Sequence, residues 1–291
     1  MSRFLYQYKK CGERTINNLK NLELCFNSME QLNDPFEGIC LFQQNDLEGC
    51  SEKEDVKQDK IKEITNNLVG KYISENIFET GRISCFTTDT EHSKGYCNEL
   101  LWAHYADSHR GVCIKYKWED VNDICDRLAS INYESFCPPI SGINDEDIMK
   151  CIYSKSKEWS YENEVRAYLK AKKIGELTQF SPEKIRDNLI YDEKYFYCME
   201  KKGKYNVIPK QIKKKCKPIA IYCGLKITSD NFEKIKDICK DNDIQLYKME
   251  QEKLNYSLNS KRINWREGGA LSLWTDLEKA VPVSEFCKGL K

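Results

Sequence analysis

The segment from Trp159 to Leu169 alternates between polar and apolar residues, which restricts the possible folds more than any other feature of the chain. On a β-strand, side chains point alternately to the two faces, at a rise of about 3.3 Å per residue. Glu162, Glu164 and Arg166 would therefore share one face, and the mostly apolar opposite face would pack on a core. We predict a strand that gathers three charges on one face. The plain alternative is a solvent-facing surface with a weak Glu164/Arg166 pair.

Length and composition indicate an ordinary globular protein. The 291 residues are 40% hydrophobic and 32% charged, which favours a folded core over disorder. Lys plus Arg equals Asp plus Glu at 46 each, so no global field draws the chain to nucleic acid or to anionic membrane. We expect a core domain over residues 1–252 and a C-terminal helical extension over residues 253–291, which contains Trp265 and Trp274.

The sequence also suggests where the protein resides and how its cysteines behave. The start becomes polar too early for a signal peptide, and no run approaches the ~20 apolar residues of a membrane span, so we expect a cytoplasmic protein without membrane contact. The 15 cysteines are scattered through apolar positions and are read as reduced. They form no C-x-x-C pair, and the chain has only 3 histidines, so no metal is expected.

The remaining pattern predicts an α+β fold with mixed or antiparallel sheets and helices packed around a cleft. The expected strands cover residues 4–8, 22–26, 82–87, 112–116, 218–224 and 244–247. The expected helices cover residues 14–22, 60–77, 99–108 and 118–129, with another opened by a capping box of Asp230 and Glu233. Asn98 would cap the helix at residues 99–108, and Gly111 would end it in a left-handed conformation. Residues 32–37 form an expected turn.

Several residues could support chemistry. Two carboxylates about 7 Å apart can act as acid and base, or can orient a sugar hydroxyl. Metal-dependent cleavage would need a further acid, which Asp107 or Asp89 could supply. Trp102 and Tyr105 lie on one helical stripe and are either core residues or stacking platforms. No Walker loop or G-x-G-x-x-G turn is present.

Lysines cluster between residues 201 and 217. They include Lys201, Lys202, Lys204, Lys213, Lys214 and Lys215. Such a tract could make weak contact with nucleic-acid phosphates. Aromatic residues and arginines are sparse in it, so a solvated segment is the simpler interpretation.

Five motifs occur in a fixed order and together resemble the bacterial family called domain of unknown function 2971, over about residues 4–250. The motifs are Phe4-Leu-Tyr-Gln-Tyr8, Asn33-Asp-Pro-Phe-Glu37, Ile83-Ser-Cys-Phe-Thr87, Leu101 to Val112, and Trp159 to Arg166. That family name implies no activity. The motifs also contain further candidate site residues, namely Asn33, Asp34, Glu37, Asp107 and His109.

The order of elements is similar, more weakly, to the split-sheet core of ADP-ribosyltransferases. In those enzymes NAD lies in a cleft between two sheets, and a late glutamate holds the nicotinamide ribose and stabilises charge as the glycosidic bond breaks. By position, the resemblance implies that Glu164 or Glu162 is catalytic and that Tyr105 stacks on nicotinamide. It assigns ribose contacts to Tyr6 or Tyr8, supported by Ser84 or Thr87.

The resemblance thus implies an NAD-dependent ADP-ribosyltransferase or NAD glycohydrolase, in a bacterial toxin or phage-defence setting, with NAD as substrate and an unidentified macromolecular acceptor. Two alternatives stay open. One is a metal-dependent nuclease that uses Glu162, Glu164 and Asp107. The other is a non-catalytic nucleotide sensor in which Trp102, Tyr105 and Arg166 bind ligand without turnover.

Overall fold

The described strands and helices form an α+β fold, as the sequence predicts. The computed structural model describes residues 3–42, 64, 68, 70, 72, 79–141, 144–177, 194–201, 204–252 and 256–264. The first part of the chain contains β1 (Phe4–Lys9), α1 (Glu13–Lys20), β2 (Glu23–Ser28), the 3-10 helix η1 (Met29–Gln31), β3 (Leu41–Phe42), β4 (Gly81–Thr88), α3 (Glu99–Tyr105), β5 (Val112–Lys117) and α4 (Trp118–Asn122). The middle part contains β6 (Arg127–Ser130), β7 (Asn132–Glu134), β8 (Pro139–Ile140), α5 (Asp145–Ile152), β9 (Ser154–Ser156), the 3-10 helix η2 (Lys157–Glu162) and β10 (Glu164–Lys170). The last part contains β11 (Gly175–Leu177), β12 (Tyr195–Lys201), β13 (Lys204–Pro209), β14 (Gln211–Lys215), β15 (Ala220–Cys223), α7 (Ser229–Asp241), β16 (Gln245–Gln251) and β17 (Leu258–Arg262).

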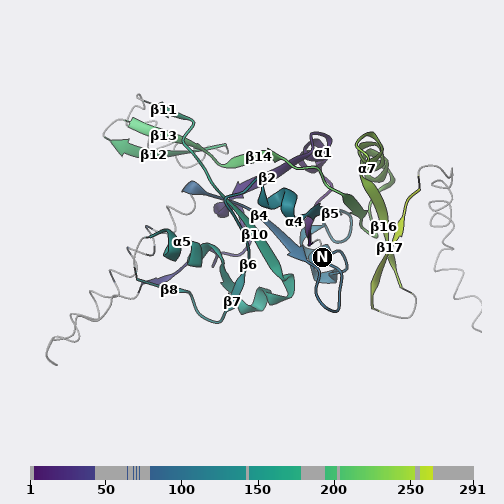
Figure 1. Ribbon diagram of the computed structural model, residues 1–291, viewed down its shortest axis with the longest axis horizontal. Helices are drawn as coiled ribbons and strands as arrows, with labels where there is room; N and C mark the ends of the chain where they lie inside the picture. Colours follow the sequence, from purple (N-terminus) through teal and green to yellow (C-terminus); the bar gives the residue numbers. More distant parts are fainter. Residues whose placement is uncertain are drawn as a thin grey trace, which may run out of the picture.

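Most strands join one mixed, 10-stranded sheet, in the order β14-β2-β4-β1-β5-β15-β16-β17, with β10 and β6 branching from β4. Its strand pairs are antiparallel except for β15 and β16, which α7 connects as a crossover. A separate 3-stranded sheet has the order β11-β13-β12 and lies beyond the β14 end of the large sheet (Figure 1). In the described part of the chain, no helix is both long and apolar enough to cross a membrane.

The sheet splits at β4, and this split positions the candidate site. One edge of β4 pairs with β10 along residues 81–87. On the opposite edge, β2 pairs only with Arg82 and Ile83, and β1 pairs only with Thr87 and Thr88. Residues 84–86 therefore lie between the diverging ends of β1 and β2. The Gln7 side chain bridges this gap, because its Nε2 donates to Ser84 Oγ at 2.8 Å and to the Cys85 carbonyl at 3.2 Å.

Both faces of the sheet are covered. Helices α1 and α7 lie beside each other on one face (Figure 1) and bury Ile16, Leu19, Phe232 and Ile235 in the main hydrophobic core. The same core takes Val165, Ala167 and Leu169 from β10, which confirms the predicted apolar face of that strand. Its other face, with Glu164, Arg166 and Tyr168, is also buried, so the solvent-facing alternative is wrong.

The predicted strand at residues 159–169 is wrong in its first half. Residues 157–162 form η2, and β10 begins at Glu164. Asn163 separates the two with a left-handed φ of 44°. Asparagine adopts this conformation more readily than most other residues, and it interrupts the extended chain. Glu162 therefore lies at the end of a helical turn, and it does not share a strand face with Glu164.

Other element boundaries also differ from the predictions. The helix that Asn98 caps ends at Tyr105, because Asp107, Ser108 and His109 have left-handed φ angles of 50°, 51° and 69°. Gly111 is not left-handed. A Cβ at Gly111 would collide with the Lys9 carbonyl oxygen and lie 2.9 Å from that of Ala106, so glycine is needed for close approach.

Two other predicted helices need correction, and one predicted helix is partly described. The segment at residues 118–129 is helical only in α4, and β6 follows it. Thr228, rather than Asp230, caps α7 by accepting a hydrogen bond from the Asn231 amide. The described residues of the predicted surface helix, at 64, 68, 70 and 72, are helical.

The C-terminal extension is only partly described. Residues 258–262, expected to be helical, form β17, which pairs with β16 in the large sheet. Trp265 and Trp274 lie outside the described residues.

Candidate functional site

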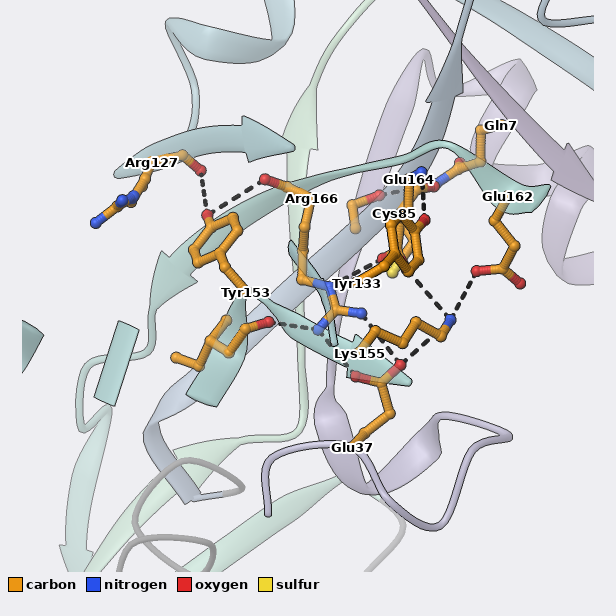
Figure 2. Close-up of polar contacts among 12 residues, drawn as sticks. Gln7, Glu37, Cys85, Arg127, Tyr133, Tyr153, Lys155, Glu162, Glu164 and Arg166 are labelled. Atoms are coloured by element: carbon orange, nitrogen blue, oxygen red, sulfur yellow. Dashed lines mark hydrogen bonds and ion pairs between the residues drawn. The ribbon is translucent and has the colours of Figure 1, made fainter. Parts of the chain in front are cut away.

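A cluster of buried charges lies where the sheet splits, with Lys155 at its centre. The Lys155 ammonium contacts one oxygen of Glu162 at 2.7 Å, of Glu164 at 3.2 Å and of Glu37 at 3.3 Å. Figure 2 shows the Lys155 side chain extending between Glu162 and Glu37. The side chains of all four residues are 6% exposed or less, so water screens these charges poorly.

Arg166 closes the other side of the cluster and is fully buried. Its guanidinium forms a two-pronged pair with Glu37, at 3.0 and 3.1 Å, and its Nε donates to Glu164 at 2.9 Å. A further bond at 2.6 Å reaches the Ile152 carbonyl. The guanidinium therefore links the β10 strand to the turn that carries Glu37, and its geometry suits such forked pairs.

Local sequence explains how these side chains converge. Asp34 accepts a hydrogen bond from the Phe36 amide at 2.9 Å, and this side-chain turn directs Glu37 inward, as the predicted turn at residues 32–37 requires. The short strand β9 presents Lys155, and the left-handed turn at Asn163 leaves both Glu162 and Glu164 within hydrogen-bond distance of its ammonium. The Tyr133 hydroxyl fixes the start of β10 by accepting from the Glu164 amide at 2.8 Å.

The two glutamates of the original motif have opposite electrostatic environments. Burial alone would raise the pKa of Glu164, but the charges of Arg166 and Lys155 outweigh burial and lower the pKa to about 2. Burial raises the pKa of Glu162, and the Lys155 charge only partly opposes it. Glu164 is therefore ionised at neutral pH, whereas Glu162 takes up a proton more readily than a free glutamate. Paired carboxylates with divergent pKa values are typical of acid–base sites.

Tyr105 connects Glu162 to Asn33, in the turn at residues 32–37. Its hydroxyl donates to Glu162 Oε1 at 2.6 Å and accepts from Asn33 Nδ2 at 3.2 Å. Burial and the hydrogen bond with Glu162 raise the pKa of Tyr105, so the hydroxyl remains protonated. Asn33, Tyr105 and Glu162 thus form one chain of hydrogen bonds that ends on Lys155.

A cavity of about 670 Å³ opens against this cluster, in the gap between β1, β2 and β4. This volume lies within the range of roughly 300–1,000 Å³ that small-molecule sites occupy. Its wall brings together nine of the predicted site residues: Tyr6, Tyr8, Asn33, Glu37, Ser84, Thr87, Tyr105, Glu162 and Glu164.

Five predicted site residues do not line this cavity: Asp34, Trp102, Asp107, His109 and Arg166. Trp102 is fully buried, packs edge-on against Tyr8 with ring centres 5.1 Å apart, and donates to the Tyr96 carbonyl. His109 stacks on Trp102, with ring centres 6.0 Å apart. Asp107 is exposed in the left-handed turn after α3 and is not in the wall of the cavity that contains Glu162 and Glu164. The three acids of the nuclease alternative are therefore not gathered at this cavity.

The basic tract is extended rather than looped, and its described part is split between two sheets. Lys213, Lys214 and Lys215, on β14, are all exposed, and Lys213 and Lys215 pair with Glu23 at 3.4 and 3.3 Å. Lys201 and Lys204 belong to the strands of the 3-stranded sheet. Lys202 lies outside the described residues. Contact with nucleic acid stays a prediction.

Sequence reasoning missed Lys155, Gln7 and Tyr133. Charge balance could have indicated Lys155, because three motif glutamates with one motif arginine leave an excess of negative charge that a core rarely tolerates. Among the residues that the structure describes, no group of three or more His, Cys, Asp or Glu side chains is arranged to hold a metal ion.

Comparison with known protein families finds a match to part of the chain. No curated protein and no solved structure matches the chain. The matching family model covers the segment from α3 to β10, which supplies Tyr105, Lys155, Glu162, Glu164 and Arg166 but neither Glu37 nor the β1 residues. The predicted resemblance is confirmed over this segment: residues 101–167 match the family described as Protein of unknown function (DUF2971).

Proposed function

We propose that this protein breaks the bond between nicotinamide and ribose in NAD, and passes ADP-ribose either to water or to a macromolecular acceptor. The observation that carries the proposal is the divergence of the two glutamate pKa values on the wall of one ligand-sized cavity. Glu164 has a pKa lowered to about 2, and Glu162 has a raised pKa. We infer that the same site serves a toxin or defence activity.

The net charge of the cluster suits this reaction. In the described part of the chain, Glu37, Glu162 and Glu164 form ion pairs with two cations, Lys155 and Arg166, so this cluster is net negative when all five groups are ionised. Cleavage of a glycosidic bond builds positive charge on the ribose ring. A fixed negative field in a poorly solvated site stabilises such charge more than it stabilises the ground state.

The two carboxylates would have separate roles. Glu164 is held ionised by Arg166 and Lys155 and would act through its field on the ribose cation. Glu162 would accept a hydrogen bond from a ribose hydroxyl and take the proton of the attacking water or acceptor. Tyr105 would lie against the nicotinamide while its hydroxyl orients Glu162.

The direct test is incubation with NAD and measurement of released nicotinamide, with and without cell lysate as acceptor. We expect release by the wild type, and a loss of about 10²–10³-fold in Glu164→Gln, the range reported for removing one group that stabilises transition-state charge. Glu162→Gln should also lose release. Glu158→Gln, at an exposed position of η2, is the matched control and should keep full activity.

Absence of nicotinamide release from the wild type under both conditions would contradict the proposal. If NAD then binds without turnover, and Glu164→Gln weakens that binding, the sensor alternative is supported. Cleavage of nucleic acid that requires magnesium and consumes no NAD would support the nuclease alternative.

A further inference from the structure

Lys9, the last residue of β1, is a partly buried cation that has no counter-ion among the described residues. Its side chain makes no hydrogen bond and no ion pair with any other residue that the structure describes. It lines the 670 Å³ cavity whose wall also contains Glu162 and Glu164, and it lines a second cavity of about 390 Å³ that shares Lys9, Lys10 and Arg14. An unpaired cation in a cavity wall is unusual, because buried lysines are nearly always paired.

Two more cations surround Lys9. Lys10 and Arg14 line both cavities, and Arg14 is held in place by a 2.9 Å bond from its Nη2 to Asn27 Oδ1. Arg14 comes from the first turn of α1, whose N-cap Gly12 provides no side-chain cap. Backbone N–H groups at such a helix start carry partial positive charge.

Among the described residues that line the two cavities, acidic side chains do not neutralise this group. Glu23 lies in the wall of the smaller cavity but is paired with Lys213 and Lys215. Glu37, Glu162 and Glu164 are bonded to Lys155 and Arg166. The cavity system therefore has a negative end at the Lys155 cluster and a positive end at Lys9.

Protonated Lys9 is less stable than a protonated lysine in water. Burial lowers its pKa, and the charge of Arg14 lowers it further. An anion between Lys9 and Arg14 would relieve both effects, since opposite charges at close range favour the charged form of each group.

We propose that Lys9 and Arg14, with Lys10 at the rim, form an anion subsite that binds a phosphate or pyrophosphate group of the ligand. The substrate would then lie with its phosphates at the positive end and its reacting sugar at Glu162 and Glu164. The assignment to pyrophosphate rests on the proposed function, because NAD carries that group between its two riboses. The anion subsite itself follows from the charges and is testable without NAD.

The test is calorimetric titration with inorganic pyrophosphate at low ionic strength. We expect the wild type to bind, Lys9→Met to bind at least about tenfold more weakly, and Arg14→Met to bind several-fold more weakly, in keeping with charge-assisted contacts. Lys9→Arg should retain binding. Lys20→Met, in the last turn of the same helix and exposed, is the matched control and should bind as the wild type does.

Arg14 is exposed, so its substitution tests the subsite even if Lys9→Met fails to fold. The proposal is overturned if wild-type protein binds no pyrophosphate, or if Arg14→Met and the folded Lys9 variants bind it as well as Lys20→Met. Pyrophosphate binding that depends on Lys9, in a protein that releases no nicotinamide, would keep the subsite and reject the NAD reaction alone.

Discussion

The Lys155 ammonium lies 2.7 Å from Glu162 Oε2, and both side chains are at least 94% buried. Lys155 pairs with Glu37, Glu162 and Glu164. Its removal would leave the three buried carboxylates of the cluster with a single cation, Arg166. The stability of the site and its electrostatic field thus depend on one lysine.

Substitution of Lys155 should therefore strongly destabilise the folded protein. We expect Lys155→Met to lower the free energy of unfolding by about 3–5 kcal/mol, the usual cost of breaking a buried pair by removing one partner. Urea unfolding followed by circular dichroism measures this. Exposed Lys157→Met is the control, and Lys155→Met combined with Glu162→Gln should recover part of the loss. Equal stability of the two single variants would contradict a central role for Lys155.

Acid should destabilise the protein through Glu164. Its pKa is about 2 in the folded protein against 4.5 normally, so its contribution is complete above about pH 4.5 and is lost as pH falls towards 2. The shift corresponds to about 3 kcal/mol. Urea unfolding at several pH values measures how the free energy of unfolding falls with pH. The decline should be shallower in Glu164→Gln than in the wild type. The exposed Glu158→Gln should follow the wild type, and identical slopes in all three proteins would reject this assignment.

The hydrogen bond from the Tyr105 hydroxyl should lower the pKa of Glu162. This bond favours the carboxylate, so Tyr105→Phe should raise the pKa of Glu162 further and cost about 1–3 kcal/mol of stability. Carbon-13 NMR titration of the Glu162 carboxyl measures the pKa. Tyr161→Phe is the control, because among the described contacts the Tyr161 hydroxyl does not bond Glu162. An unchanged pKa in Tyr105→Phe would mean that the bond is not made in solution.

Gly111 should not tolerate a side chain. Its Cβ would press on the backbone carbonyls of Lys9 and Ala106, and neither can move without distorting β1 or the turn after α3. We expect Gly111→Ala to cost about 1–3 kcal/mol. Gly12→Ala, with no atom within 4 Å of the added Cβ, should cost less. Thermal unfolding compares the two, and a Gly111→Ala protein as stable as Gly12→Ala would count against the close approach.

The sequence predicts local features well and tertiary partnerships poorly. Alternation in Val165, Ala167 and Leu169 correctly assigned the buried face of β10, because strand periodicity is a property of the chain itself. The same periodicity misplaced Glu162, since one left-handed residue, Asn163, breaks it.

Lys155 could not be placed from its neighbours in sequence. A lone lysine between serines normally lies at the surface, and its burial depends on carboxylates from a turn at residue 37 and from β10. The split between β1 and β2 likewise depends on where each strand pairs with β4, which no local pattern specifies.

The pairing of Glu37 with Arg166 spans 129 positions of the chain. During synthesis Glu37 is therefore made 129 residues before its partner, and a nascent chain that has not yet reached Arg166 cannot assemble the charge cluster. The acidic half of the cavity can form only after β10 has been made, so fragments that end before Arg166 would lack it.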